Sequence, residues 1–379
     1  MTIRSTFLDR VRRLEKDHEP YVPGMTREAA ARIAGVPAAE IVKLSSNENP
    51  LGASPAAKAA IAAMIDAIHE YPNSTADALR AAIGVHLDVG ADQVVVGAGS
   101  SSLMHAMMAA FTEPGGEVVA LDPSFSVYRE IARAHGRVPV AVPLRTTDFT
   151  LDLETFAAAL SDKTQLVFLT RPNNPTSTLI PLGDFVRAAH LAGEKGALVV
   201  SDEAYIEFSD SDKPSAVAFL RGPAPELPHV MVSRTFSKAF GLANLRLGYA
   251  VGTRETARAL ALANAKWPTG DLAQKAGIAA LADTVHLART HAAVAEGRNY
   301  LVAEFGALGL AVVPNPQGNY VMVDVRKTGL DAAGFAQLVF DLGRVLVRGD
   351  FSPHHVRVSV GTAYENARLL GAVRRLMPG

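Results

Sequence analysis

Several polar side chains stand at or a few residues after the ends of apolar, strand-like segments, at positions where they can do chemistry. Lys238 comes after the segment VMV, Asp202 after LVVS and Asn174 after QLVFLT. A lysine on the floor of a cleft offers a nucleophilic amine, and a carboxylate there is costly to bury unless a cation faces it. Tyr205 stands three residues after Asp202 and can face the same cleft. Taken singly, each residue also fits an ordinary surface, capping or turn position.

Hydroxyl groups and an arginine near two further strand ends are suited to phosphate. Ser100 and Ser101 follow VVVGAG at the start of an expected helix, where backbone N–H groups bind anions. The glycine pair lacks the third glycine of a dinucleotide fingerprint. Thr235, Ser237 and Arg246 flank the lysine segment. Because leucines enclose Arg246, its base should be buried and its head group should meet an anion, either a ligand or a structural carboxylate.

Together these groups match the parts of a single ligand. An amine suits an aldehyde, a carboxylate suits a protonated ring nitrogen, and the pair Asn174 and Tyr205 suits a phenolate oxygen. The serine, threonine and arginine groups suit a phosphate. Pyridoxal 5′-phosphate carries all four features, and proteins that use it supply a lysine and an acidic partner for the ring nitrogen. The sequence therefore predicts this cofactor.

The segments that must position these residues have the pattern of a parallel sheet. Continuous apolar runs alternate with helix-length segments, which is typical of an α/β fold with a mainly parallel sheet covered on both faces. In such sheets ligands bind at the carboxyl ends of the strands. Strands are expected at 93–99, 117–121, 138–142, 164–170, 196–201 and 229–233. Helices are expected at 102–112, 128–136 and 182–196.

The last third of the chain has a different pattern. After an Ala-rich helical stretch it reads strand, helix, strand, strand, helix, which suits a smaller α+β domain. We predict a large domain at 50–268 and a small domain made of 1–49 and 269–379.

Composition excludes several classes of protein. The 379 residues correspond to two or three domains of about 150 residues. A net charge of −1 predicts no nucleic-acid partner. The absence of cysteine excludes thiolate metal sites, and we predict no metal. No apolar run reaches the ~18 residues of a membrane span, and the N-terminal segment lacks a signal-like apolar core. We predict a soluble, cytoplasmic protein without a membrane partner.

Longer motifs carry a family resemblance over nearly the whole chain. NNPTS, SDEAYIEF, RTFSKAFGLANLRLGY and VRVSVG resemble, in order, the motifs of class I/II aminotransferases of pyridoxal-phosphate fold type I. The 36-residue separation of Asp202 and Lys238 fits that family. YVPG, LSSNENPLG and EYPN resemble the histidinol-phosphate aminotransferases.

The resemblance implies roles around the cofactor. Lys238 would link to the aldehyde and carry the proton between substrate Cα and cofactor C4′, and Asp202 would keep the ring nitrogen protonated. Asn174 and Tyr205 would hold the ring oxygen, and Phe125 would stack on the ring. The phosphate would be held by Ser100, Ser101, Thr235, Ser237 and Arg246.

The resemblance also implies partners and substrates. Tyr71 would reach the phosphate of a neighbouring subunit, which implies a homodimer. Arg357 would grip the substrate carboxylate with a bidentate fork, and Arg348, Tyr21 and Asn47 match positions on the substrate side. The substrates would be an amino donor and an oxo acceptor that use one site in turn.

Some residues depart from the family pattern and leave the substrate open. GSSSL lacks the acidic pair that histidinol-phosphate enzymes commonly carry, so an aromatic aminotransferase is a close alternative. A threonine-phosphate decarboxylase-like lyase is a further alternative on the same scaffold. Arg171 is either a solvated loop charge or an extra anion contact. Trp267 either walls the substrate pocket or packs in a core.

Overall fold

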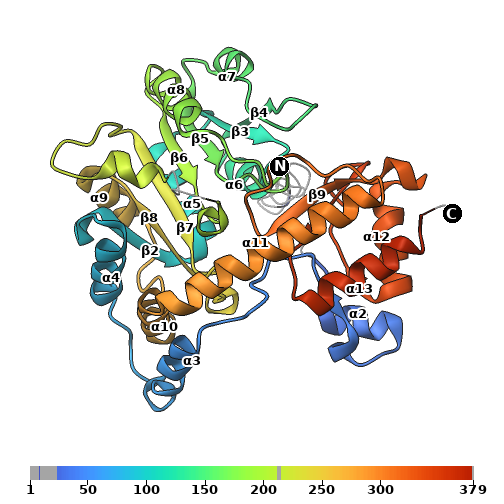
Figure 1. Cartoon of the computed structure of the whole chain (residues 1–379). Helices are drawn as coiled ribbons and strands as arrows, with labels where there is room; N and C mark the ends of the chain where they lie inside the picture. Colours follow the sequence, from blue (N-terminus) through green and yellow to red (C-terminus); the bar gives the residue numbers. More distant parts are fainter. Residues whose placement is uncertain (1–7, 9–23, 211–214, 378–379) are drawn as a thin grey trace.

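A seven-stranded sheet lies at the centre of the larger part of the chain (Figure 1). The computed structural model describes residue 8, residues 24–210 and residues 215–377. Across the sheet the strands are β2 (Val94–Ala98), β8 (Leu247–Val251), β7 (Val230–Thr235), β6 (Leu198–Asp202), β5 (Thr164–Thr170), β3 (Glu117–Asp122) and β4 (Val138–Pro143). Neighbours are parallel, except that β8 runs antiparallel to β2 and β7. The predicted α/β class and mainly parallel sheet are confirmed.

Helices cover both faces of this sheet, which explains why its strands are apolar throughout. Successive residues Val199 and Val200 of β6 pack into two different hydrophobic clusters, one on each face. The cluster on one side includes residues of α5 (Gly99–Phe111), α6 (Val127–Ala134) and α9 (Arg254–Ala263). The other includes residues of α3 (Pro55–Ala62), α4 (Asp77–Leu87), α7 (Leu153–Ala159), α8 (Leu182–Gly193) and α10 (Asp271–Ala282).

The smaller part joins the two ends of the chain. Its strands are β1 (Val42–Lys43), parallel to β10 (Val345–Leu346), and β9 (Tyr320–Asp324), antiparallel to β11 (His355–Ser359). Its helices are α2 (Arg27–Ala34), α12 (Ala332–Gly343) and α13 (Ala363–Arg374). Val42 and Leu44 share one hydrophobic cluster with Val345 and Val358, so the N-terminal segment packs with the C-terminal strands. The domain boundaries themselves stay a prediction.

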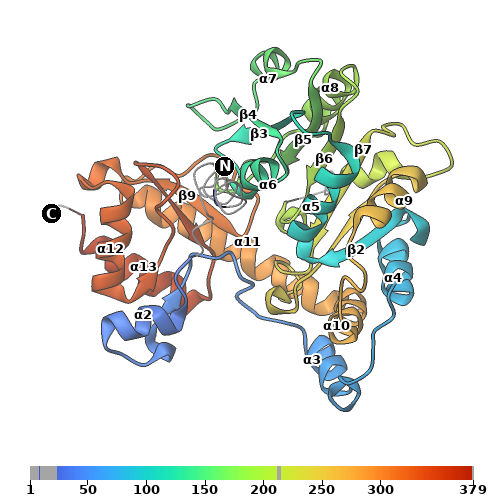
Figure 2. The same cartoon turned by 180° about the vertical axis from the view of Figure 1, so that it is seen from behind.

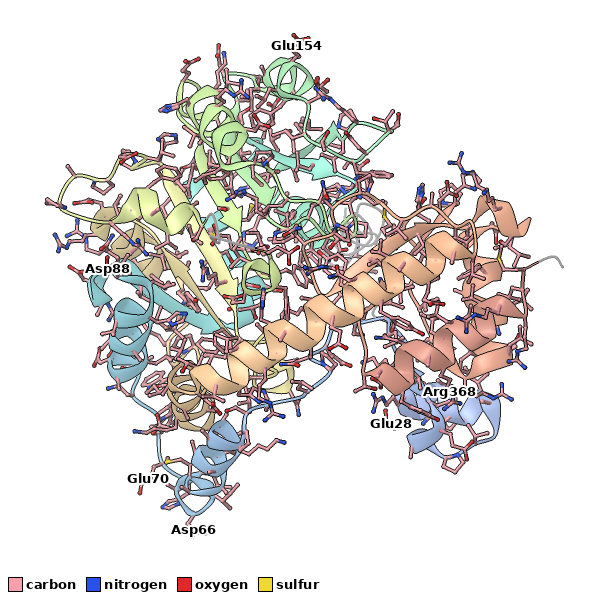
Figure 3. The ribbon with its side chains drawn as sticks, in the orientation of Figure 1. Glu28, Asp66, Glu70, Asp88, Glu154 and Arg368 are labelled. Atoms are coloured by element: carbon pink, nitrogen blue, oxygen red, sulfur yellow. The ribbon has the colours of Figure 1, made fainter. Side chains whose placement is uncertain are left out.

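One long helix connects the two parts. Helix α11 (Thr284–Ala307) runs from beside α10 to beside β9 in both views (Figures 1 and 2). Below the sheet, the segment after α3 protrudes from the molecule, and its labelled Asp66 and Glu70 lie at the lower edge of Figure 3. Within the described residues, no helix has both the length and the apolar character that a membrane span requires. The cellular location stays a prediction.

Candidate active site

Thirteen of the fifteen residues predicted for the site line one cavity of about 290 Å³. They are Asn47, Ser100, Ser101, Phe125, Asn174, Asp202, Tyr205, Thr235, Ser237, Lys238, Arg246, Arg348 and Arg357. Tyr71 lies elsewhere on the surface, with 86% of its area exposed. Tyr21 lies outside the described residues. The lining carries four cationic side chains and two carboxylates, a balance that suits an anionic ligand.

The sheet topology explains why residues so distant in sequence meet. Strands β5, β6 and β7 are parallel, so Asn174, Asp202 and Lys238, which end or follow them, reach the same edge. Strand β8 is antiparallel, so its beginning lies at that edge, and Arg246 comes immediately before it. The direction of β8 therefore places an arginine where the parallel strands place the lysine and the acid.

Asp202 is a buried carboxylate whose surroundings suit a cationic ligand. It is 3% exposed. Burial raises its pKa from the ordinary 3.8 to about 6, while hydrogen bonds from the Tyr128 hydroxyl and the Ala204 N–H oppose the rise. These bonds measure 2.6 Å and 3.1 Å. Among the described residues no lysine or arginine pairs with Asp202, so a protonated ring nitrogen would supply the missing positive charge.

Lys238 carries its amine into the same cavity. It follows the end of β7 and is half-buried, and its Nζ donates to the backbone oxygen of Ser46 at 3.0 Å. The amine also lies 5.6 Å from the ring centroid of Tyr205. A neutral carbonyl leaves the amine available for reaction, because no strong ion pair has to be broken first.

The residues predicted for phosphate surround the beginning of α5. Ser100 and Ser101 stand in its first turn, where the helix presents unpaired N–H groups. Gly99 has a φ of +76°, and a Cβ there would lie 2.6 Å from Nη2 of Arg246. This positive φ favours glycine, and the guanidinium of Arg246 lies close to this helix end. Thr235 and Arg246 line the same cavity, and within the part of the chain that the structure describes Arg246 forms no ion pair with a carboxylate.

The predicted substrate-side residues Arg357 and Asn47 form hydrogen bonds with other residues that line the cavity. Arg357 is buried and donates from Nη1 to Oδ1 of Asn174 and from Nη2 to the backbone oxygen of Ser45, both at 2.5 Å. Asn47 donates to the hydroxyl oxygen of Tyr205 at 3.2 Å, which leaves the Tyr205 hydrogen for a ligand. These contacts orient an arginine and a phenol toward the cavity.

The structure adds site residues that the sequence reasoning missed. Tyr128 and Thr170 line the cavity and contact the Asp202 region. Ser45 also lines it, and its buried hydroxyl has no hydrogen-bond partner among the described residues. Tyr128 lies just inside α6, three residues after the predicted Phe125, and this closeness in sequence is the signal that could have pointed to it.

Two residues with open roles lie elsewhere than expected. Arg171 is 0% exposed, donates to the backbone oxygen of Ile180 and lies 3.9 Å from Glu203. Both interpretations offered for it were wrong, because a buried carboxylate and a carbonyl take up its charge inside the protein. Trp267 is 52% exposed and lies beside Tyr71, with ring centroids 5.6 Å apart and ring planes tilted by 42°. It therefore belongs neither to a core nor to this cavity.

Comparison with known proteins agrees with this geometry. Residues 39–373 match the family model for aminotransferase class I and II. The chain belongs to this family. The class I/II membership confirms the predicted pyridoxal-phosphate-dependent aminotransferase, and the site residues described above fit that cofactor.

Individual relatives of this aminotransferase agree with the assignment. Histidinol-phosphate aminotransferase of Symbiobacterium thermophilum is 40% identical over 96% of this chain and 98% of its own. The structure of histidinol-phosphate aminotransferase from Sinorhizobium meliloti in complex with pyridoxal-5′-phosphate has a TM-score of 0.81 and 27% identity. It covers 94% of this chain and 95% of its own. The structure of an aspartate aminotransferase double mutant from Thermus thermophilus has a TM-score of 0.83 and 26% identity. The match covers 96% of this chain and 99% of that one.

Proposed function

We propose that this aminotransferase moves an amino group between histidinol phosphate and a 2-oxo acid, with pyridoxal 5′-phosphate as cofactor. The names of relatives that are 40% and 39% identical to this chain support this substrate. The proposal assigns Lys238, Asp202, Asn174 and Tyr205 to the cofactor ring, Phe125 to its face, and the hydroxyls near α5 with Arg246 to its phosphate.

The observation that carries the choice of substrate is a group of arginines that extends from the main cavity into a neighbouring hollow. Next to the main cavity lies a hollow of about 410 Å³ that shares Phe125, Asn174, Arg348 and Arg357 with it. Its lining has four arginines and three carboxylates. A phosphate-bearing amine needs such positive charge, whereas a free phenylalanine or tyrosine needs an apolar wall at this place.

The chain's own residues then divide the work. Bound pyridoxal phosphate draws electrons away from the substrate Cα and so makes its proton removable. The amine of Lys238 would take this proton and return it at cofactor C4′. Asp202 would hold the proton on the ring nitrogen, and Asn174 with Tyr205 would hold the ring oxygen. Arg357 orients the substrate through an anionic group. Each half-reaction uses these same residues in opposite directions.

A half-reaction screen tests the proposed substrate. The loaded enzyme is mixed separately with histidinol phosphate, phenylalanine, tyrosine, glutamate and threonine phosphate, and conversion of the cofactor to its amine form is followed by absorbance. We expect histidinol phosphate to react with the highest kcat/KM. Faster reaction with phenylalanine or tyrosine would replace the proposal by an aromatic aminotransferase. Carbon dioxide release from threonine phosphate without a keto acid would indicate the lyase.

Replacing Arg348 sharpens this screen. Its Nε donates to Asp350 at 2.7 Å, so the guanidinium is held at the rim of both hollows. Arg348→Ala should lower kcat/KM for histidinol phosphate by about 10- to 100-fold, the range of a lost hydrogen-bonded charge, and change the value for phenylalanine little. An equal loss of kcat/KM for both substrates would contradict a contact between Arg348 and the substrate phosphate.

The protruding segment leads us to propose a homodimer in which Tyr71 serves the partner's site. Glu70 lies at the lower edge of the molecule in Figure 3, and Tyr71 follows it with its ring exposed beside Trp267. An exposed aromatic pair of this kind suits a contact with a second copy.

Mixing two damaged subunits tests this arrangement. Dimers of Tyr71→Ala and dimers of Lys238→Ala should each have low activity. After the two are dissociated and reassociated, both defects meet in one site of each hybrid, and about a quarter of all sites become intact. Recovery of activity supports a tyrosine contributed across the interface. A mixture no more active than its components, with hybrids shown to form, contradicts it.

A further inference from the structure

A buried tyrosine contacts the carboxylate of Asp202 from behind. Tyr128 is 1% exposed, and its hydroxyl lies 2.6 Å from Oδ2 of Asp202 and 2.9 Å from Oγ1 of Thr170. Its ring stacks on that of Phe168 with centroids 4.4 Å apart and planes 8° apart. Phe125, predicted to stack on the cofactor, meets the Tyr128 ring edge-on at 5.5 Å. Aromatic packing therefore fixes the position of this hydroxyl.

The directions of these hydrogen bonds follow from counting hydrogens. An ionised Asp202 has no hydrogen to donate, so the hydroxyl of Tyr128 must donate to it. The hydroxyl oxygen of Tyr128 then accepts from Thr170, whose hydroxyl has a hydrogen available. Accepting one bond makes a hydroxyl a better donor in the next. A protonated Asp202 would not need this donor, so the arrangement favours the ionised carboxylate.

We propose that Tyr128 is a positioning residue that keeps the proton of the Asp202–cofactor pair on the ring nitrogen. Asp202 and the ring nitrogen would share one proton, and either partner can hold it. A donor aimed at the carboxylate favours the arrangement in which Asp202 is ionised and the ring is cationic. This inference rests on the proposed use of pyridoxal phosphate and adds Tyr128, supported by Thr170, to the residues that control the reaction.

The surroundings of Asp202 otherwise favour its protonated form. Burial raises the pKa of Asp202, and the neighbouring Glu203 carboxylate raises it further. Of the groups that lower this pKa, the hydrogen bond from Tyr128 has the largest effect, ahead of the Ala204 N–H. Lys238 and Tyr205 are also titratable, and they line the same cavity as Asp202. Without Tyr128, burial would draw the shared proton toward the carboxylate.

Tyr128→Phe tests the proposal, because it removes one oxygen and keeps the ring that stacks on Phe168. The loaded enzyme is prepared with pyridoxal phosphate labelled with ¹⁵N in the ring, and the nitrogen signal is recorded at one pH. We expect the signal to move from the protonated toward the unprotonated position. We also expect kcat to fall by about 10- to 100-fold, the effect of losing a hydrogen bond to a charge, with KM little changed.

Two further variants make the test specific. Thr170→Val removes the donor to Tyr128 and should move the nitrogen signal in the same direction by a smaller amount. This variant also keeps the proposal testable if Tyr128→Phe does not fold. Tyr249→Phe removes the hydroxyl of another fully buried tyrosine and should leave the signal in place. An unmoved signal in both Tyr128→Phe and Thr170→Val would overturn the inference. An unprotonated ring nitrogen in the unmodified enzyme would instead contradict the proposed function.

Discussion

Replacing Lys238 by alanine is expected to lower kcat by about 10⁴-fold or more, the upper range for loss of an acid–base group. The variant should also lose the visible absorption of the lysine-linked cofactor. The physical reason is that the amine is placed in the same cavity as Asp202, and no second lysine lines this cavity among the described residues. Steady-state rates and the absorption spectrum of the purified variant measure both effects.

The fold of this variant should survive, which separates loss of chemistry from loss of structure. Lys238 is half-buried, and its described hydrogen bond goes to one carbonyl, that of Ser46. Lys195→Ala is a matched control, because this lysine pairs with Asp162 on the surface at 2.9 Å. A small added amine should restore part of the activity of Lys238→Ala by entering the space left. Turnover near the original rate without any added amine would remove Lys238 from the mechanism.

The strands of the sheet could be predicted from sequence because burial on both faces leaves a continuous apolar run. The run at 164–170 coincides with β5, and the run at 229–233 covers most of β7. The order of the strands could not be predicted in this way, because neighbours such as β3 and β5 are brought together by packing between distant segments. The antiparallel direction of β8, which places Arg246 at the site, is a feature of this kind.

The site was predictable where a residue follows a strand, and much less where it lies on a helix or a loop. Asp202 and Asn174 are recognisable because they stand at or just after strand ends. Tyr128 has no such signal in its own sequence, since a tyrosine in an amphipathic helix normally packs in a core. Arg171 also follows a strand, but neither it nor its partner Glu203 lines the cavity. A position just after a strand does not by itself reveal whether the side chain points into the cavity or into the protein interior.

Replacing Asp202 by asparagine is expected to lower kcat by about 100- to 1000-fold, the usual effect of removing a charge that stabilises a transition state. Asparagine is neutral and can no longer hold a proton on the ring nitrogen. The cofactor should still link to Lys238, because the aldehyde end of the ring is untouched, so the visible absorption should remain. Undiminished rates with this variant would contradict the role of Asp202 as partner of the ring.

The same replacement should stabilise the protein without cofactor, in a manner that depends on pH. The fold raises the pKa of Asp202 from 3.8 to about 6. Ionising this buried carboxyl therefore lowers the free energy of unfolding. The decrease is complete above pH 6 and disappears as the pH falls toward 3.8. The asparagine side chain would carry no such cost, while the hydroxyl of Tyr128 can still donate to its amide oxygen. Melting temperatures of the cofactor-free proteins should therefore favour Asp202→Asn at pH 8 and converge near pH 4. A melting-temperature difference that stays constant between pH 8 and pH 4 would mean that the buried charge of Asp202 does not destabilise the cofactor-free protein.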